Sequence, residues 1–105
     1  MLDEARREAM KLKQALEARG VRVEAIYLFG SVARGDFRAD SDFDFIIVSR
    51  DWQGMPYLER LGLLYRLWSG RRDATLIPLT PEELRDRVEK SVALRDASRY
   101  WVRIA

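Results

Sequence analysis

Apolar residues recur every three or four positions at the start of the chain, and this period changes further along. Between residues 2 and 19 the spacing predicts an amphipathic helix, with Gly20 as its left-handed C-terminal cap. The stripe extends over barely more than two heptads, so we favour packing against a sheet over pairing with a partner helix. The apolar residues of the stripe are Leu2, Ala5, Ala9, Leu12 and Leu16.

Several runs have the pattern of β-strands. Residues 21–29 begin with alternation and become continuously apolar, as in a strand that enters the middle of a sheet. Residues 43–48 are β-branched and aromatic, and residues 74–79 alternate, with Pro78 predicting an edge or the end of pairing. Residues 100–104 also alternate, which is compatible with an added edge strand or with a dimer contact.

Two further helices are expected, one on each side of the third strand. The first follows a turn at residues 51–55, begins near Pro56 and should cover the sheet with Leu58, Leu61, Leu64, Tyr65 and Trp68. We expect its aromatic residues in the core and not stacked on a nucleobase. The second starts at a capping box made by Thr80 and Glu83, and its apolar face is Leu84, Val88 and Val92.

Candidate chemistry is concentrated at residues 30–44, which read GSVARGDFRADSDFD. Gly30 permits a tight turn, and Ser31 adds a hydroxyl before amides that could bind an anion, although an ordinary strand-to-helix turn is the alternative. Asp42 and Asp44 are two residues apart in a strand, so their carboxylates share one face and could converge on a hard cation.

Arg34 and Ser41 are the other polar candidates in this stretch. Arg34 could reach a triphosphate, or it could hold the loop through the nearby acids Asp36 and Asp40. We expect Ser41 to cap local backbone before the second strand.

Composition narrows the possible chemistry. The chain has no Cys and no His, which leaves only metals with oxygen ligands. A net charge of +2 is too small to indicate nucleic-acid binding. At 105 residues we expect one domain, residues 1–105, without room for a separate acceptor-binding domain. The sequence lacks a membrane-length apolar run, so we expect a cytoplasmic protein.

The sequence from Gly30 to Asp44 resembles the G-S-x-A-R-G…S-D-x-D signature of the DNA polymerase beta-like nucleotidyltransferases, in particular the minimal nucleotidyltransferases. The resemblance implies an α/β (α+β) fold, with a small mixed β-sheet covered by helices as in the polymerase beta-like palm. It implies that Gly30, Ser31 and Arg34 bind the nucleotide phosphates. It also implies that Asp42 and Asp44 are catalytic and bind two magnesium ions, with ATP as substrate.

The family usually supplies a third carboxylate from the neighbouring strand, and Thr75 stands at that position in this chain. A threonine hydroxyl brings no negative charge and is a poor base, so activation of the attacking hydroxyl should suffer. Asp73, two residues earlier on the same face, could replace the missing acid. Alternatively it is a surface acid paired with Arg71 or Arg72.

Two functional hypotheses follow. The first is transfer of AMP from ATP to a hydroxyl, on a helical HEPN-type partner protein in a toxin–antitoxin pair, as the resemblance implies, or on a small molecule. The second is an impaired domain that binds nucleotide or a partner without turnover, because of Thr75. A homo-oligomer is compatible with both.

Overall fold

The computed structural model describes residues 2–35 and 42–105. Its centre is a four-stranded sheet in the order β3-β2-β1-β4. Strands β1 (Ala25–Phe29) and β2 (Phe43–Val48) are antiparallel, β3 (Ala74–Leu79) is parallel to β2, and the short β4 (Val102–Arg103) is antiparallel to β1. The mixed sheet flanked by helices confirms the predicted fold class.

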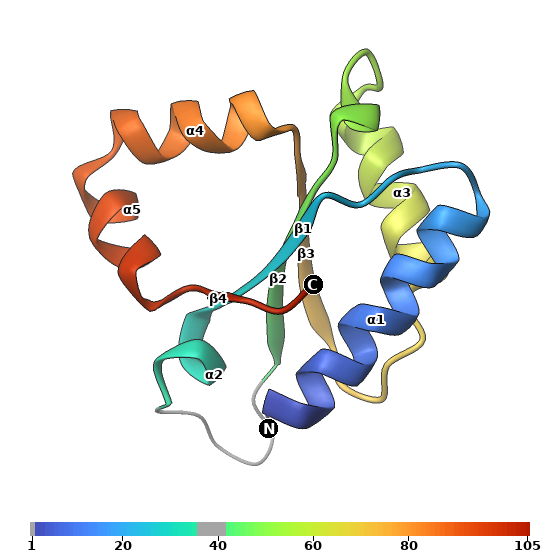
Figure 1. Cartoon of the computed structure of the whole chain (residues 1–105), viewed down its shortest axis with the longest axis horizontal. Helices are drawn as coiled ribbons and strands as arrows, with labels where there is room; N and C mark the ends of the chain where they lie inside the picture. Colours follow the sequence, from blue (N-terminus) through green and yellow to red (C-terminus); the bar gives the residue numbers. More distant parts are fainter. Residues whose placement is uncertain (1, 36–41) are drawn as a thin grey trace.

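Helices α1 (Leu2–Ala18) and α3 (Tyr57–Leu67) cover one face of the sheet (Figure 1). Of the predicted stripe of α1, Ala5, Ala9, Leu12 and Leu16 are buried there, whereas Leu2 is 42% exposed. Gly20 has the expected positive φ of 86°. The strands contribute apolar side chains that are almost fully buried: Ile26, Leu28, Phe43, Phe45, Ile47 and Leu76. We call this side of the sheet the closed face.

The other face lies toward a helical arm at the C-terminal end of the chain (Figure 1). The arm consists of α4 (Pro81–Lys90), α5 (Val92–Ala97) and a 3₁₀ turn, η2 (Ser98–Tyr100). Every residue of α4 and α5 keeps some exposure, so the arm covers this face incompletely. We call this side the open face.

The first predicted strand is too long at its N-terminal end. Residues 21–24 precede β1 because the backbone of Arg22 bonds to side chains instead of a neighbouring strand: its N–H donates to Asp51 Oδ2 at 2.8 Å, and its carbonyl accepts from the Ser49 hydroxyl. A second 3₁₀ turn, η1 (Arg50–Trp52), carries Asp51. Side-chain bonding at this junction therefore delays the start of the sheet.

The predicted buried face of α3 is only partly correct. Leu64 is buried as predicted, but Leu58 is 79% exposed and Tyr65 is 48% exposed, and the unpredicted Arg60 is buried. Arg60 is buried because its guanidinium pairs with Glu83 Oε1 at 2.7 Å and bonds to the carbonyls of Met55 and Pro78. The helix is thus rotated to bury a satisfied cation, and Trp68 is only partly buried beside the core.

Tyr65 has a different role from the predicted one in the core. Its hydroxyl donates to the Ala74 carbonyl at 3.1 Å and accepts from the Leu76 N–H at 3.0 Å. Both groups belong to the outer edge of β3, where Pro78 has no N–H to offer. Tyr65 therefore occupies hydrogen-bonding positions that a further strand would use.

The capping box at the start of α4 is as predicted: the Thr80 hydroxyl accepts from the Glu83 N–H, and the Glu83 carboxylate accepts from the Thr80 N–H. The helix ends earlier than expected, because Ser91 is extended and its hydroxyl accepts from the Leu94 N–H, which starts α5. Val92 is consequently 72% exposed and does not continue the face of Leu84 and Val88.

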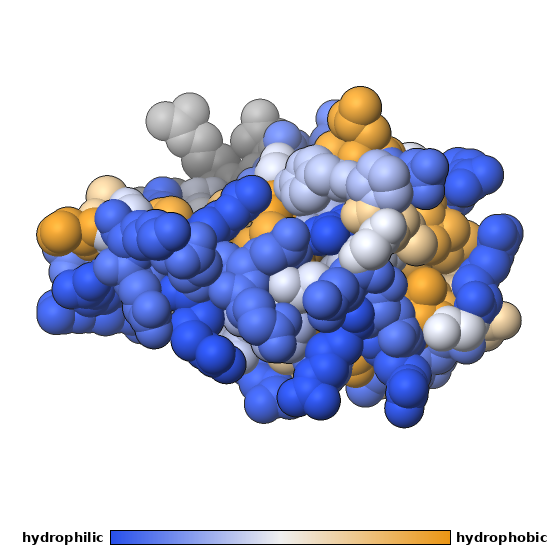
Figure 2. All heavy atoms as spheres, turned by 90° about the horizontal axis from the view of Figure 1, so that it is seen from above, coloured by the Kyte–Doolittle hydropathy of each residue, from blue (hydrophilic) through white to orange (hydrophobic). Residues whose placement is uncertain are grey.

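The C-terminal segment pairs as an edge strand of this chain's own sheet, with Leu28 opposite Val102 in register. Exposed apolar side chains are found mainly on α3 and the arm. Figure 2 shows a largely hydrophilic surface on which hydrophobic side chains form separate small groups. Each helix in the described part of the chain is too short or too polar to cross a membrane.

Candidate functional site

The turn between β1 and α2 (Gly30–Arg34) lies against the start of β2. Gly30 has a φ of 74°, and a Cβ atom added to it would overlap the Oδ2 atom of Asp44. Both the left-handed backbone and the close approach of a carboxylate therefore require glycine at this position. The glycine predicted to form the turn also makes room for Asp44.

Asp44 lies in register between Phe29 of β1 and Thr75 of β3. Thr75 hydrogen-bonds to its carboxylate. The structure thus brings together Gly30, Asp44 and Thr75, on the open face of the sheet. The register places Thr75 opposite Asp44, in the position where the resemblance to the family leads one to expect a third carboxylate.

The electrostatics of Asp44 are those of a partly desolvated acid. Burial raises its pKa above the ordinary value, and the negative charge of Asp42 raises it further. The hydrogen bond from Thr75 and the positive charge of Arg34 act in the opposite direction but do not cancel the rise. Asp42 and Asp44 are therefore close enough to repel, and a cation would relieve this repulsion.

Asp73 lies just before β3, and its carbonyl accepts from the Phe43 N–H at 3.2 Å. Among residues 2–35 and 42–105, no three acidic side chains are grouped closely enough to hold a metal ion. The carboxylate of Asp73 is thus not assembled with those of Asp42 and Asp44. Its role as a replacement acid stays a prediction.

Ser31 and Arg34 belong to α2, which ends at Gly35. The Ser31 carbonyl accepts from the Gly35 N–H at 3.0 Å, and the positive charge of Arg34 acts on Asp44. Binding of phosphate by Ser31 and Arg34 stays a prediction. Asp36, Asp40 and Ser41, for which loop contacts or capping were predicted, lie outside the described residues.

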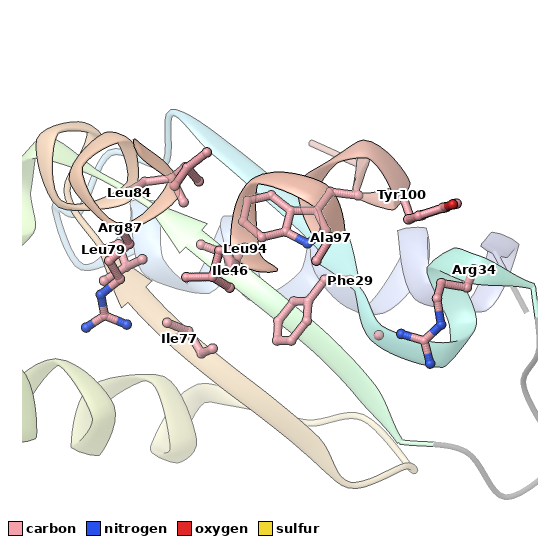
Figure 3. Close-up of a pocket in the computed structure, with 13 residues that line it drawn as sticks. Phe29, Arg34, Ile46, Ile77, Leu79, Leu84, Arg87, Leu94, Ala97 and Tyr100 are labelled. Carbon is pink, nitrogen blue, oxygen red and sulfur yellow. The ribbon is translucent and has the colours of Figure 1, made fainter. Parts of the chain in front are cut away.

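A cavity of about 340 Å³ extends from this turn across the open face to the arm (Figure 3). Its floor includes Phe29 of β1, Ile46 of β2 and Ile77 of β3. The arm contributes Leu84, Val88, Leu94, Ala97 and Tyr100, and Trp101 follows directly after the arm. Gly30 and Arg34 line one end, and Figure 3 draws Arg87 at the other. The cavity is therefore continuous with the turn that contacts Asp44.

This cavity was not predicted from the sequence, because its walls come from residues that are far apart in the chain. The available signal was weak: Leu84 and Val88 form an apolar stripe on a helix that is otherwise polar. Trp101 connects the arm to β1, with its ring centroid 6.3 Å from that of Tyr27 and 6.4 Å from that of Phe29.

The donor set fits a divalent cation of the magnesium type. Mg²⁺ in proteins is bound by one or two carboxylates together with water and substrate phosphates, and Asp42 and Asp44 supply such a pair. The Thr75 hydroxyl adds a neutral oxygen next to Asp44. The pair is suited to a cation that arrives with phosphate, and it is less suited to a dedicated site in which protein side chains provide all the ligands.

Comparison with known proteins agrees with this geometry. The family model for the nucleotidyltransferase domain matches residues 9–99. A crystal structure from Sulfolobus solfataricus, described as a candidate nucleotidyltransferase, superposes with a TM-score of 0.63 at 29% identity, covering 83% of this chain and 72% of that protein. No curated protein matches the sequence.

Two BolA structures from Arabidopsis thaliana are also similar in part. The BolA domain of SufE1 has a TM-score of 0.47 at 24% identity, covering 70% of this chain and 92% of that one. BolA1 has a TM-score of 0.48 at 23% identity, covering 72% and 94%. This likeness is too low to bear on function. The family match over residues 9–99, together with the Sulfolobus structure, shows that the chain belongs to the nucleotidyltransferase-domain family.

Proposed function

We propose that this chain is a magnesium-dependent nucleotidyltransferase that transfers AMP from ATP to a hydroxyl group of a partner protein. The observation that carries the proposal is the contact between the Gly30 turn and Asp44, with Asp42 beside it. Members of the family generally use a nucleoside triphosphate and a divalent metal. The choice of ATP, and of a HEPN-type partner in a toxin–antitoxin pair, rests on the resemblance of the motif to the minimal nucleotidyltransferases.

In the proposed reaction the acceptor oxygen attacks the α-phosphorus of ATP. A new P–O bond forms, the bond to the β-phosphate bridging oxygen breaks, and pyrophosphate leaves in line with the attack. Asp42 and Asp44 would hold two magnesium ions. Bound there, these ions would neutralise phosphate charge and stabilise the entering and leaving oxygens. The chain itself contributes fixed charges and positions.

The proton of the acceptor hydroxyl needs a base. A third carboxylate would usually take this role, and Thr75 is a poor substitute because a neutral hydroxyl is a weak base. The hydrogen bond from Thr75 also stabilises charge on Asp44, so Thr75 supports the metal pair more than proton transfer. We therefore expect slow turnover.

The proposal is tested by incubating the full chain with ATP labelled at the α-phosphate, magnesium and the product of the neighbouring gene. We expect label on the partner protein and release of pyrophosphate, both absent when magnesium is chelated. A matched reaction with a small-molecule hydroxyl acceptor in place of the protein tests the alternative acceptor class.

A second candidate function is supported by Thr75: a domain that binds nucleotide or a partner protein without turnover. It predicts measurable ATP binding with neither transferred label nor pyrophosphate. That outcome would refute the enzyme proposal and leave the binding proposal in place.

A further inference from the structure

We propose that the cavity between the open face and the arm binds the nucleoside part of the nucleotide, with the base held by apolar and aromatic contact and not by recognition of its edge. This inference rests on the proposed function, since it assumes that the triphosphate lies at the Gly30 turn. It goes further by assigning a place to the base and by predicting which bases are accepted.

The position of the cavity favours the nucleoside over the acceptor. Gly30 and Arg34 line the cavity and also belong to the proposed phosphate turn, so an occupant would be continuous with the phosphates. In an in-line displacement the acceptor attacks from the side opposite the leaving pyrophosphate. With pyrophosphate at the Gly30 turn, the acceptor approaches from the other side of Asp44, and the cavity is left for the nucleoside.

The lining of the cavity suits a flat ring system. Its floor of Phe29, Ile46 and Ile77 is joined in the lining by Leu94 of the arm and by Trp101, which follows the arm. Its volume of about 340 Å³ lies at the lower end of the range for small-molecule pockets. Aromatic side chains stack on any base, because every base has a π-face. A ring system inserted here would cover apolar surface that is exposed without it.

The same lining has little capacity to read the edge of a base. Within the described ranges 2–35 and 42–105, the side chains that line the cavity include no carboxylate and no amide, and the charged ones, Arg34 and Arg87, are hydrogen-bond donors only. Apart from the Tyr100 hydroxyl, no lining side chain in the described part of the chain offers a strong acceptor to the amino group of adenine. Stacking and shape therefore determine which base is accepted. This predicts similar binding of ATP and GTP, and weaker binding of UTP, whose pyrimidine base is smaller.

Two matched pairs of variants test this inference. Leu94 and Ala97 line the cavity, whereas their neighbours Val92 and Ala93 are exposed on the same short helix and do not. L94W and A97W would fill the cavity, and V92W and A93W place the same side chain beside it. All four positions are on the exposed arm, so the fold should tolerate each change.

Binding of ATP and of inorganic tripolyphosphate, both with magnesium, is measured by calorimetry. We expect L94W and A97W to bind ATP roughly ten- to a hundredfold more weakly than wild type, the range of a lost stacking contact, while tripolyphosphate binding changes by less than about twofold. The two control variants should bind both ligands like wild type.

Intrinsic fluorescence gives an independent readout. Trp101 lines the cavity, while Trp52 is buried in the closed-face core and Trp68 packs against that core. ATP should quench the fluorescence of wild type and tripolyphosphate should not, and Trp101→Phe should remove this difference.

Unchanged ATP affinity in L94W and A97W would overturn the inference while leaving the proposed transferase intact. Equal weakening of ATP and tripolyphosphate would also overturn it, because the arm would then act on the phosphates. An ATP affinity more than about a hundredfold above that for GTP would contradict recognition by stacking alone. Wild-type protein that binds neither ligand would overturn both the inference and the proposed function.

Discussion

The two faces of the sheet use the same strands for different purposes. Along β2, Phe43, Phe45 and Ile47 enter the closed face and are fully buried, while the alternate positions point to the open face and begin with Asp44. The closed face is sealed by α1 and α3, whereas the arm leaves a cavity over the open face. Strand β2 thus contributes to the stable core on one side. On its other side it carries Asp44, whose carboxylate is partly desolvated and still accessible to a ligand.

The largest expected effect tests whether the closed face supplies the stability. Ile47 is 0% exposed, whereas Ile77 of the paired strand lines the cavity. Ile47→Ala should lower the free energy of unfolding by about 3–4 kcal/mol and the matched Ile77→Ala by about 1–2 kcal/mol, because only the first leaves a closed cavity. Urea unfolding measures both. Equal losses would contradict the distinction between the faces.

The ion pair between Glu83 of the arm and Arg60 of α3 connects the arm to a helix of the closed face. Burial raises the pKa of Glu83, but the bonds from Arg60 and the Thr80 N–H outweigh it, so that pKa is lowered overall. Glu83→Gln should lower the free energy of unfolding by about 1–3 kcal/mol, because it leaves the guanidinium of Arg60 buried without the charge of Glu83 beside it. Thermal unfolding measures the loss, and exposed Glu82→Gln is the control.

The sign of the pH dependence follows from the lowered pKa of Glu83. Its stabilisation is present in full above the ordinary carboxyl pKa and is lost as pH falls through the lower folded-state pKa. The difference in stability between wild type and Glu83→Gln should therefore shrink in acid. A constant difference across this range would mean that the charge of Glu83 does not stabilise the arm.

On the open face, Thr75→Asp restores an acid opposite Asp44. We expect turnover with the partner protein to rise by roughly ten- to a hundredfold, equivalent to about 1.4–2.8 kcal/mol of transition-state stabilisation, because a carboxylate can accept the hydroxyl proton. Pyrophosphate release measures the rate. Asp73→Ala is the companion variant and should leave turnover unchanged; a clear loss would identify Asp73 as the replacement acid.

The smallest effect is a gain in stability from Asp44→Asn. Since burial raises the pKa of Asp44, the folded state binds its proton more tightly than the unfolded state does. Stability of the metal-free protein therefore falls as pH rises from the ordinary carboxyl pKa through the folded-state pKa, and stays lower above it. Asp44→Asn should remove this loss and so raise the free energy of unfolding by up to about 1 kcal/mol at neutral pH, since the group is only half-buried.

Chemical denaturation across pH, without metal, measures that gain. The same variant should weaken magnesium-dependent ATP binding, so stability and binding change in opposite directions. If Asp44→Asn destabilised the protein at neutral pH, the carboxylate would be a structural group and not a ligand held at an energetic cost.

Local chemistry explains which parts of the structure could be predicted from sequence. The Thr80 capping box and the Gly20 cap were predicted because the residues that form them are neighbours in the chain. The opposition of Asp44 and Thr75 was expected from the family motif, and parallel pairing of β2 and β3 produces it.

The orientation of α3 and the cavity were not predicted correctly, because both depend on contacts between residues that are far apart in the chain. The orientation of α3 depends on Arg60 reaching Glu83, and an arginine on an amphipathic helix gives no sign that it will be buried. The cavity likewise depends on how the arm is placed, since Ser91 ends α4 and redirects the chain toward Trp101.

The bonds of Tyr65 limit how this protein can assemble. Many proteins form larger sheets by adding a strand from a second copy to a free edge. At β3 an incoming strand would have to displace the Tyr65 hydroxyl and would then meet Pro78, which has no N–H. The opposite edge, β4, is only two residues long. A homo-oligomer or a complex with a partner protein should therefore associate through side-chain surfaces, and growth of a continuous sheet from chain to chain is disfavoured at both ends.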